Sequence, residues 1–307
     1  MSSVLPAPYN VPITAWIEEA KPDPIRYLER QATGILLHAI GITPELRKSL
    51  VLKGGILMSL VHGSYRQTGD VDFTAIVDPH PYHGMLKAVF NGALPRAAAD
   101  LGYVDLSLAV QRFEYHPKAE GFEDMRAPAL KITIGYAVKG SPDEARLERG
   151  QSTRVLQVDV SFKEPVTRAS EVLLDDTDVS IQTYTIDEII AEKYRAMIQQ
   201  VLRNRMRRQD VYDIAWLLTK YEPDDELRAT ILQTLIVKCA DRDIEPAPSS
   251  LDDPEIRRRS SAEWDAMRLE VGNLPDFGPL FDQVVAFYRL LPWAVEGIMS
   301  GLPHGNG

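Results

Sequence analysis

Residues 52–77 restrict the fold more than any other segment, and they read L-K-G-G-I-L-M-S-L-V-H-G-S-Y-R-Q-T-G-D-V-D-F-T-A-I-V. A brief strand over 50–52 is predicted to end at Gly54-Gly55, and residues 56–65 are predicted to form a helix. Polar and apolar side chains alternate over 70–77, which is typical of a strand with one buried face, so Asp70 and Asp72 share a face. Strand, glycine turn, helix and strand in this order indicate a sheet-based α/β domain.

The rest of the chain divides into two parts. Strands are predicted over 106–115, 129–138, 154–162 and 179–184, and helices over 25–40, 44–49 and 83–101. From Thr185 the pattern is helical, and Thr185 with Glu188 forms a T-x-x-E capping box that predicts a helix start. We expect an α+β fold, with a mixed sheet and flanking helices over 1–184 and a mostly helical domain over 185–307. The helices expected there cover 186–203, 209–221, 224–239, 261–271 and 276–290.

Composition excludes several classes of protein. The 307 residues include 45% hydrophobic and 25% charged side chains, the balance of a globular chain. No apolar run approaches the ~20 residues that cross a bilayer, so no membrane association is expected. The single cysteine, Cys239, excludes an internal disulfide and a cysteine zinc cluster, and suggests a reducing, cytoplasmic setting. The net charge of −10 argues against a general nucleic-acid coat protein and leaves room for a local basic site.

The glycine pair and the aspartates suggest phosphate chemistry. Two glycines before a helix let a bulky anion approach backbone amides, as in a phosphate cradle. Asp70 and Asp72 offer paired oxygen ligands that suit Mg²⁺ together with substrate phosphates. Asp159 faces away from the apolar side of its own strand, so it could complete a two-metal site for phosphoryl transfer. The simpler alternatives are an ordinary turn, a solvated strand face and a carboxylate on an edge strand.

The spacing G-G-x(14)-D-x-D resembles the signature of the DNA polymerase β-like nucleotidyltransferase superfamily. More narrowly, L-K-G-G and then R-x-T-x-D-V-D-F at Arg66–Phe73 are similar to the AbiEii/AbiGii toxin-type nucleotidyltransferases. Two later segments resemble the remaining motifs of that family, E-I-I-A-E-K-Y-R-A at Glu188–Ala196 and R-R-Q-D-V-Y-D-I-A-W-L-L at Arg207–Leu218. The resemblance implies a nucleotidyltransferase-like first domain and a helical second domain that completes the active-site cleft.

The resemblance also implies roles for single residues. Gly54 and Gly55 would hold the triphosphate of an NTP, while Asp70 and Asp72 would bind metal and activate the attacking hydroxyl. The helical motifs would supply Lys193 as a triphosphate contact and Asp210 as the essential acid, with Asp213 beside it.

Two positions depart from the superfamily pattern. Gly55 stands where a serine is frequent, and Ile56 stands where a small hydroxyl residue is frequent. Phosphate binding would then rely on backbone amides, helped by Ser59 or Ser64. Arg66, in the same motif, joins the nucleotide-binding set.

Lys193 falls within the apolar stripe of its helix, three or four residues from isoleucine and methionine neighbours. A buried ammonium needs an anion. That anion is either a phosphate in a cleft or the carboxylate of Asp210 or Asp213, which share a helix face. Asp210 immediately precedes an apolar run, so it also fits a helix N-cap.

The sequence therefore predicts a Mg²⁺-dependent nucleotidyltransferase. The resemblance implies that it is the toxin of a toxin–antitoxin or phage-defence pair, with a cognate antitoxin as partner. It also implies that the acceptor is the end of an RNA, most specifically a tRNA. A small-molecule nucleotidyltransferase of the antibiotic-modifying kind and an inactive nucleotide-binding module are the alternatives. Six basic residues and no acidic one lie between Lys193 and Arg208, which suggests RNA binding at Arg203–Arg208 rather than an ordinary helix end.

Overall fold

The computed structural model describes residues 9–118, 121–175 and 177–293. The chain forms two compact units, Met1–Thr185 and Ile186–Gly307. All eight strands of the described residues belong to the first unit, and no helix in the described part of the chain is long and apolar enough to span a membrane. The strands are β1 Tyr9–Val11, β2 Leu50–Lys53, β3 Asp70–Ala75, β4 Leu106–His116, β5 Ala129–Val138, β6 Val155–Phe162, β7 Ala169–Leu174 and β8 Ser180–Tyr184.

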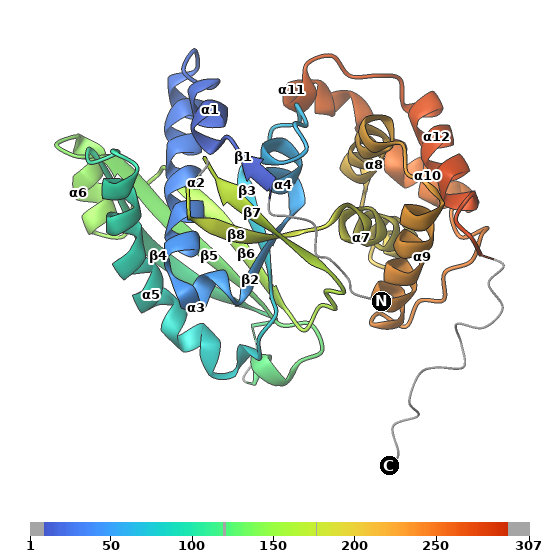
Figure 1. Cartoon of the computed structure of the whole chain (residues 1–307), viewed down its shortest axis with the longest axis horizontal. Helices are drawn as coiled ribbons and strands as arrows, with labels where there is room; N and C mark the ends of the chain where they lie inside the picture. The colour runs from blue at the N-terminus through green and yellow to red at the C-terminus, as the bar shows by residue number, and fades with distance from the viewer. Residues whose placement is uncertain (1–8, 119–120, 176, 294–307) are drawn as a thin grey trace. The chain divides into compact units, whose positions relative to one another are not determined.

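The strands form one sheet in the order β1-β7-β8-β2-β3-β6-β5-β4 (Figure 1). Pairs β1–β7, β2–β8 and β3–β6 are parallel, while β2–β3, β4–β5, β5–β6 and β7–β8 are antiparallel. The expected mixed sheet is therefore confirmed. Strand β3, which carries both aspartates, lies in the interior of the sheet between β2 and β6.

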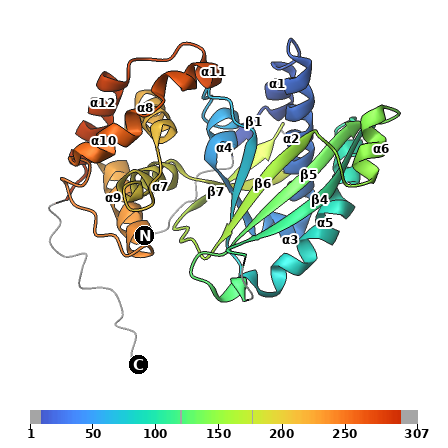
Figure 2. The same ribbon diagram turned by 180° about the vertical axis from the view of Figure 1, so that it is seen from behind.

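The sheet has one apolar face and one polar face around β3. Val71 and Phe73 of β3 and Val158 and Val160 of β6 are buried on one side, as strand alternation requires. Helices α2, Pro24–Ile42, and α5, Pro79–Asp100, lie on one side of the sheet, and the view from behind shows β4, β5 and β6 in front of them (Figure 2). The polar side chains of β3 and β6 point to the opposite face, on which Asp70 and Gln157 are exposed and Thr74 is buried.

The first unit also contains four shorter helices. They are α1 Ile13–Glu18, α3 Pro44–Arg47, α4 Gly54–Leu60 and α6 Pro142–Glu148. Asp23 caps α2, since its carboxylate accepts the amide of Ile25 at 3.1 Å, and Pro24 follows at the first helical position.

The described residues of the second unit form six α-helices. Tyr194 lies at the centre of their core, because its hydroxyl donates to the carbonyl of Val284 at 2.9 Å and its ring packs edge-on against Tyr288. The helices are α7 Ile186–Gln199, α8 Arg208–Tyr221, α9 Asp225–Ala240, α10 Pro254–Ser261, α11 Arg268–Val271 and α12 Phe277–Arg289.

Several elements differ from expectation. Helix α4 ends at Leu60 rather than residue 65, α7 ends at Gln199 rather than 203, and a 3₁₀ turn, Trp264–Met267, precedes α11 within the single helix expected over 261–271. The capping box correctly predicts the helix start, since α7 begins at Ile186 directly after Thr185. The side-chain cap is not formed, because the Thr185 hydroxyl finds no hydrogen-bond partner among the described residues. Glu188 pairs with Lys238 at 2.6 Å.

Candidate functional site

The glycine turn lies directly beneath one of the aspartates. Gly54 begins α4 with a φ of +72°, a conformation that a side chain rarely adopts, and a Cβ there would overlap the carboxylate of Asp72. At Gly55 a Cβ would come within 2.7 Å of the Thr68 side chain. The first helical turn and the strand with the carboxylates are therefore in close contact, and only glycines permit it.

Asp72 and Asp159 are neighbours across the sheet. Parallel strands β3 and β6 pair Asp72 with Asp159 and Asp70 with Gln157, so Asp70, Asp72 and Asp159 share the polar face. The alternative that Asp159 lies on an edge strand is wrong, because β6 lies between β3 and β5. The three candidate metal ligands thus meet on one patch of sheet.

The charges of this patch influence one another. Partial burial and the negative charge of Asp159 raise the pKa of Asp70, while Lys131 acts against this rise. The ammonium of Lys131 forms an ion pair with the carboxylate of Asp159 at 3.6 Å. As the side chains stand, no group of three or more His, Cys, Asp or Glu in the described part of the chain is arranged to hold a metal ion.

A buried polar network supports the turn from below. Lys53, the last residue of β2, forms an ion pair with Glu164 and donates to the Ser161 hydroxyl at 2.8 Å. Thr74 joins the same network, with its hydroxyl 3.2 Å from Glu164 and 2.7 Å from the Tyr184 hydroxyl. The network fixes the end of β2, which directly precedes Gly54. Sequence reasoning missed Lys53, although a lysine closing a buried strand just before a glycine pair was a usable signal.

The hydroxyl groups expected to help bind phosphate have protein partners. Ser59 accepts the indole N–H of Trp16 at 3.0 Å, and the buried Ser64 accepts the backbone amide of Arg66 at 3.3 Å. The Arg66 side chain is also buried. Thr68, packed against Gly55 and two residues before Asp70, is a hydroxyl beside the turn that sequence reasoning did not single out.

In the second unit Lys193 lies between two carboxylates. Its ammonium is 3.1 Å from Asp210 and 2.6 Å from the fully buried Asp213. The other oxygen of Asp210 is 3.7 Å from Arg207. The ion pair considered for Lys193 is therefore present. Asp210 belongs to the first turn of α8 and is not its cap, because the cap position is Arg207.

A second buried ion pair holds α7 against α9. Glu188, fully buried, contacts the ammonium of Lys238 at 2.6 Å, and Asp187 accepts the hydroxyl of Thr234 at 3.2 Å. Both acidic residues fall within or beside the first family-like helical motif. The sequence marked Glu188 only as a capping residue, and its true partner lies 50 residues further along the chain.

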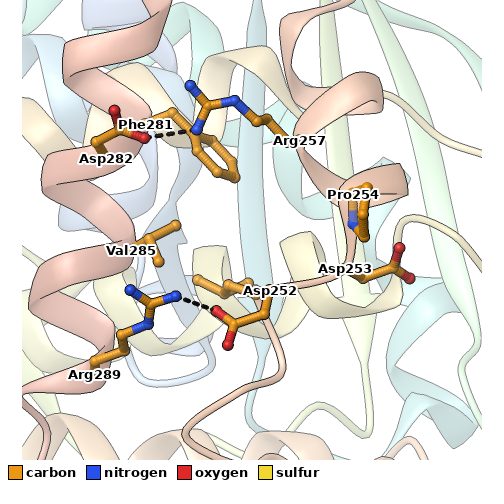
Figure 3. A pocket seen from close by; sticks show the side chains of 9 residues that line it. Asp252, Asp253, Pro254, Arg257, Phe281, Asp282, Val285 and Arg289 are labelled. Carbon is orange, nitrogen blue, oxygen red and sulfur yellow. Dashed lines mark hydrogen bonds and ion pairs between the residues drawn. The ribbon is translucent and has the colours of Figure 1, made fainter.

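A surface pocket of about 390 Å³ lies between the start of α10 and α12 (Figure 3). Arg257 pairs with Asp282 and Arg289 with Asp252, each at 2.6 Å, over an apolar wall that includes Phe281. Each of these charges is balanced within the wall, and none of the predicted site residues lines the pocket. The pocket therefore offers no reactive group of its own.

The comparison with known families agrees with the motifs. The family model for the nucleotidyl transferase AbiEii toxin of type IV toxin–antitoxin systems matches residues 35–287. No curated protein matches the chain. The matched range contains the glycine turn, the three aspartates of the sheet and the Lys193 ion pair. The chain therefore belongs to the AbiEii nucleotidyltransferase toxin family.

Proposed function

We propose that this protein transfers an NMP group from an NTP to a hydroxyl at the end of an RNA. The RNA we expect is a tRNA, and the reaction takes place in the cytoplasm. One observation supports the proposal most. The Asp72 carboxylate covers Gly54 while Asp70 and Asp159 share its face of the sheet. Triphosphate-binding backbone and paired carboxylates are thus adjacent, as phosphoryl transfer requires.

The reaction has a simple balance. The acceptor oxygen forms a bond to the α-phosphorus of the NTP, the bond from that phosphorus to the bridging oxygen breaks, and pyrophosphate leaves. The hydroxyl proton passes to a carboxylate of the patch, Asp70 or Asp72. Backbone amides at Gly54 and Gly55 bind phosphate oxygens.

We expect the carboxylate patch to bind divalent metal, although its three carboxylates do not converge on one ion as the side chains stand. Asp70 and Asp72 are hard oxygen ligands on one strand face, with Asp159 as the third candidate, and their mutual repulsion is relieved by a cation. Bound Mg²⁺ would neutralise charge on the phosphates during transfer. From the two helical motifs, Lys193 would add positive charge for the triphosphate. Asp210 and Asp213 would hold the ammonium of Lys193 in place.

Transfer to RNA is tested by incubating the protein with each labelled NTP, Mg²⁺ and total RNA. Label should appear on RNA, and Asp72→Asn should lower the rate by roughly a hundredfold or more. Asp105→Asn, an exposed aspartate of the same unit, is the matched control and should retain the wild-type rate. Label on small hydroxylated compounds alone would favour the small-molecule enzyme. Nucleotide binding without any transfer would favour the inactive module, against which the presence of Asp70, Asp72, Lys193 and Asp210 argues.

A toxin of this family implies a cognate antitoxin. We expect expression of the chain alone to arrest growth and Asp72→Asn to relieve the arrest, since the effect requires transfer.

A further inference from the structure

We propose that an arginine cluster at the ends of α7 and α9 binds the phosphate backbone of the RNA acceptor. The cluster consists of Arg195, Arg203, Arg205 and Arg207, with the buried Arg242 side chain, 8% exposed, behind them, all within the second unit. The inference rests on the proposed function for the identity of the RNA as acceptor, and adds where that RNA is held.

The fold brings these residues together because α7 and α9 run in the same direction. Thr234 of α9 contacts Asp187 at the start of α7, and Lys238, one turn later, lies 3.7 Å from Glu192. Contacts that advance together along both helices place the two C-terminal ends side by side. Arg242, just beyond α9, therefore meets the turn that follows α7.

That turn exposes its arginines. The amide of Arg203 donates to the Gln199 carbonyl at 3.1 Å and the amide of Arg205 to the Gln200 carbonyl at 2.9 Å, so the chain reverses tightly after α7. Both side chains are exposed. Arg195 reaches the same place, since its guanidinium donates to the side-chain oxygen of Gln199 at 3.1 Å.

The guanidinium groups are close enough to repel one another. Desolvation first, and then the positive charges of Arg242, Arg195, Arg207 and Arg205, lower the pKa of Arg203. Such repulsion costs free energy in the folded protein, and a bound anion relieves it.

Carboxylates balance only part of the cluster. Arg207 pairs with Asp210 at 3.7 Å and Arg242 with Asp241 at 3.2 Å. Within the described ranges, Arg195, Arg203 and Arg205 form no ion pair with a carboxylate. Two helix C-termini contribute about half a negative charge each. Three guanidinium groups therefore face roughly one compensating charge, which an ordinary helix end does not explain.

The structure also narrows the basic segment expected from the sequence. Arg208 is left out of the cluster, because its guanidinium forms an ion pair with Glu263 at 3.0 Å. Leu202 and Met206 are 81% and 50% exposed between the arginines. An open turn with positive charge and apolar side chains suits a long polyanion with sugars and bases. An enclosed amide cradle, as at Gly54, suits a triphosphate better.

The test measures binding of unfractionated tRNA at several salt concentrations. Arg203→Glu/Arg205→Glu should weaken binding at least tenfold at about 0.1 M salt and reduce the salt slope by about two units, one for each lost phosphate contact. Arg258→Glu/Arg268→Glu is the matched control, with the same charge change on arginines that each pair with a carboxylate, at 2.6 and 3.3 Å. This control should keep the wild-type slope. The cluster variant should melt at the wild-type temperature or above it, since it loses like-charge repulsion.

The outcomes separate this inference from the proposed function. An unchanged slope in the cluster variant, an equal loss in the control, or no tRNA binding by the wild-type protein would each overturn the cluster as an RNA site. A lower NTP affinity in the cluster variant would assign the cluster to the triphosphate and overturn it as well. Salt-dependent tRNA binding that the cluster variant loses, without NMP transfer to any RNA, would support the cluster while contradicting the proposed reaction.

Discussion

At Gly54 the absence of a side chain creates the site. The positive φ of this residue turns the chain from β2 into α4, and the space where a Cβ would stand is filled by the Asp72 carboxylate. Glycine is therefore required at position 54 for two reasons: the backbone has a positive φ, and there is no room for a Cβ beside Asp72. They can be separated experimentally because Gly102 has the same backbone conformation, with a φ of +75°, and open space around it.

We expect Gly102→Ala to destabilise the protein by about 1–2 kcal/mol, because it forces a side chain into the left-handed region. Gly54→Ala should destabilise it by more, because its Cβ also overlaps Asp72. Only Gly54→Ala should also displace Asp72. A displacement of about 1 Å lowers transfer roughly a hundredfold. Urea unfolding measures the first effect and NMP transfer the second. Equal transfer rates in the two variants would contradict the close approach of turn and carboxylate.

The candidate residues on one strand could be predicted from sequence, while their neighbours could not. Alternation alone places Asp70 and Asp72 on one face. The position of Asp159 beside Asp72 depends on the pairing of β3 with residues 87 positions further along the chain, which no local pattern encodes. The same holds for Lys53 and Glu164, which lie 111 residues apart. Long-range register, not local propensity, assembles the polar patch.

Among whole elements, long periodic segments were predicted, and of the short ones α3 and β2 were predicted while α6, β1 and β7 were missed. Helices α2, α8 and α9 were predicted within two residues of their ends at most, because each repeats buried residues at helical spacing. Helix α6 was not predicted, since only Leu147 of its seven residues is buried. Strand β1 has three residues, and β7 was missed although it is paired on both sides. These elements form because the sheet supplies their partners.

Helix α7 carries Lys193 and Glu188, which each form a buried ion pair in the second unit. Lys193→Met would leave the carboxylates of Asp210 and Asp213 without their ammonium. Removing one partner of a buried pair costs about 3–5 kcal/mol. We expect a loss of this size in chemical unfolding together with loss of transfer.

A triple variant separates the two roles of Lys193. Lys193→Met/Asp210→Asn/Asp213→Asn removes all three charges and should recover most of the stability. Transfer should stay absent if either the ammonium or the Asp210 carboxylate acts in the reaction. Recovery of transfer along with stability would show that the ion pair is structural only.

At the scale of the whole molecule, each unit has its own hydrophobic core, and the lysine ion pairs described above each lie within one unit. Lys53 with Glu164 and Lys131 with Asp159 lie within the first unit. Lys193 and Lys238 find their carboxylates within the second. Each set is buried or half-buried where it forms, so each unit carries a separate electrostatic cost and a separate cooperative core. The chain offers one natural probe that tells the two units apart, Cys239, its single cysteine.

Cys239 should react with thiol reagents only when the second unit opens. Its side chain is fully buried near the end of α9, and burial raises the pKa of the thiol to about 12 against the opposing charge of Arg195. Because the thiolate is the reactive form, an exposed thiol of ordinary pKa would label much faster as the pH rises from about 7 to about 9. Cys239 stays protonated over that range, so native labelling should remain slow and nearly independent of pH. In urea, labelling should rise with the loss of helical circular dichroism, and Cys239→Ser should give no signal. Rapid labelling of the native protein that follows pH would mean that α9 opens while the rest of the fold persists.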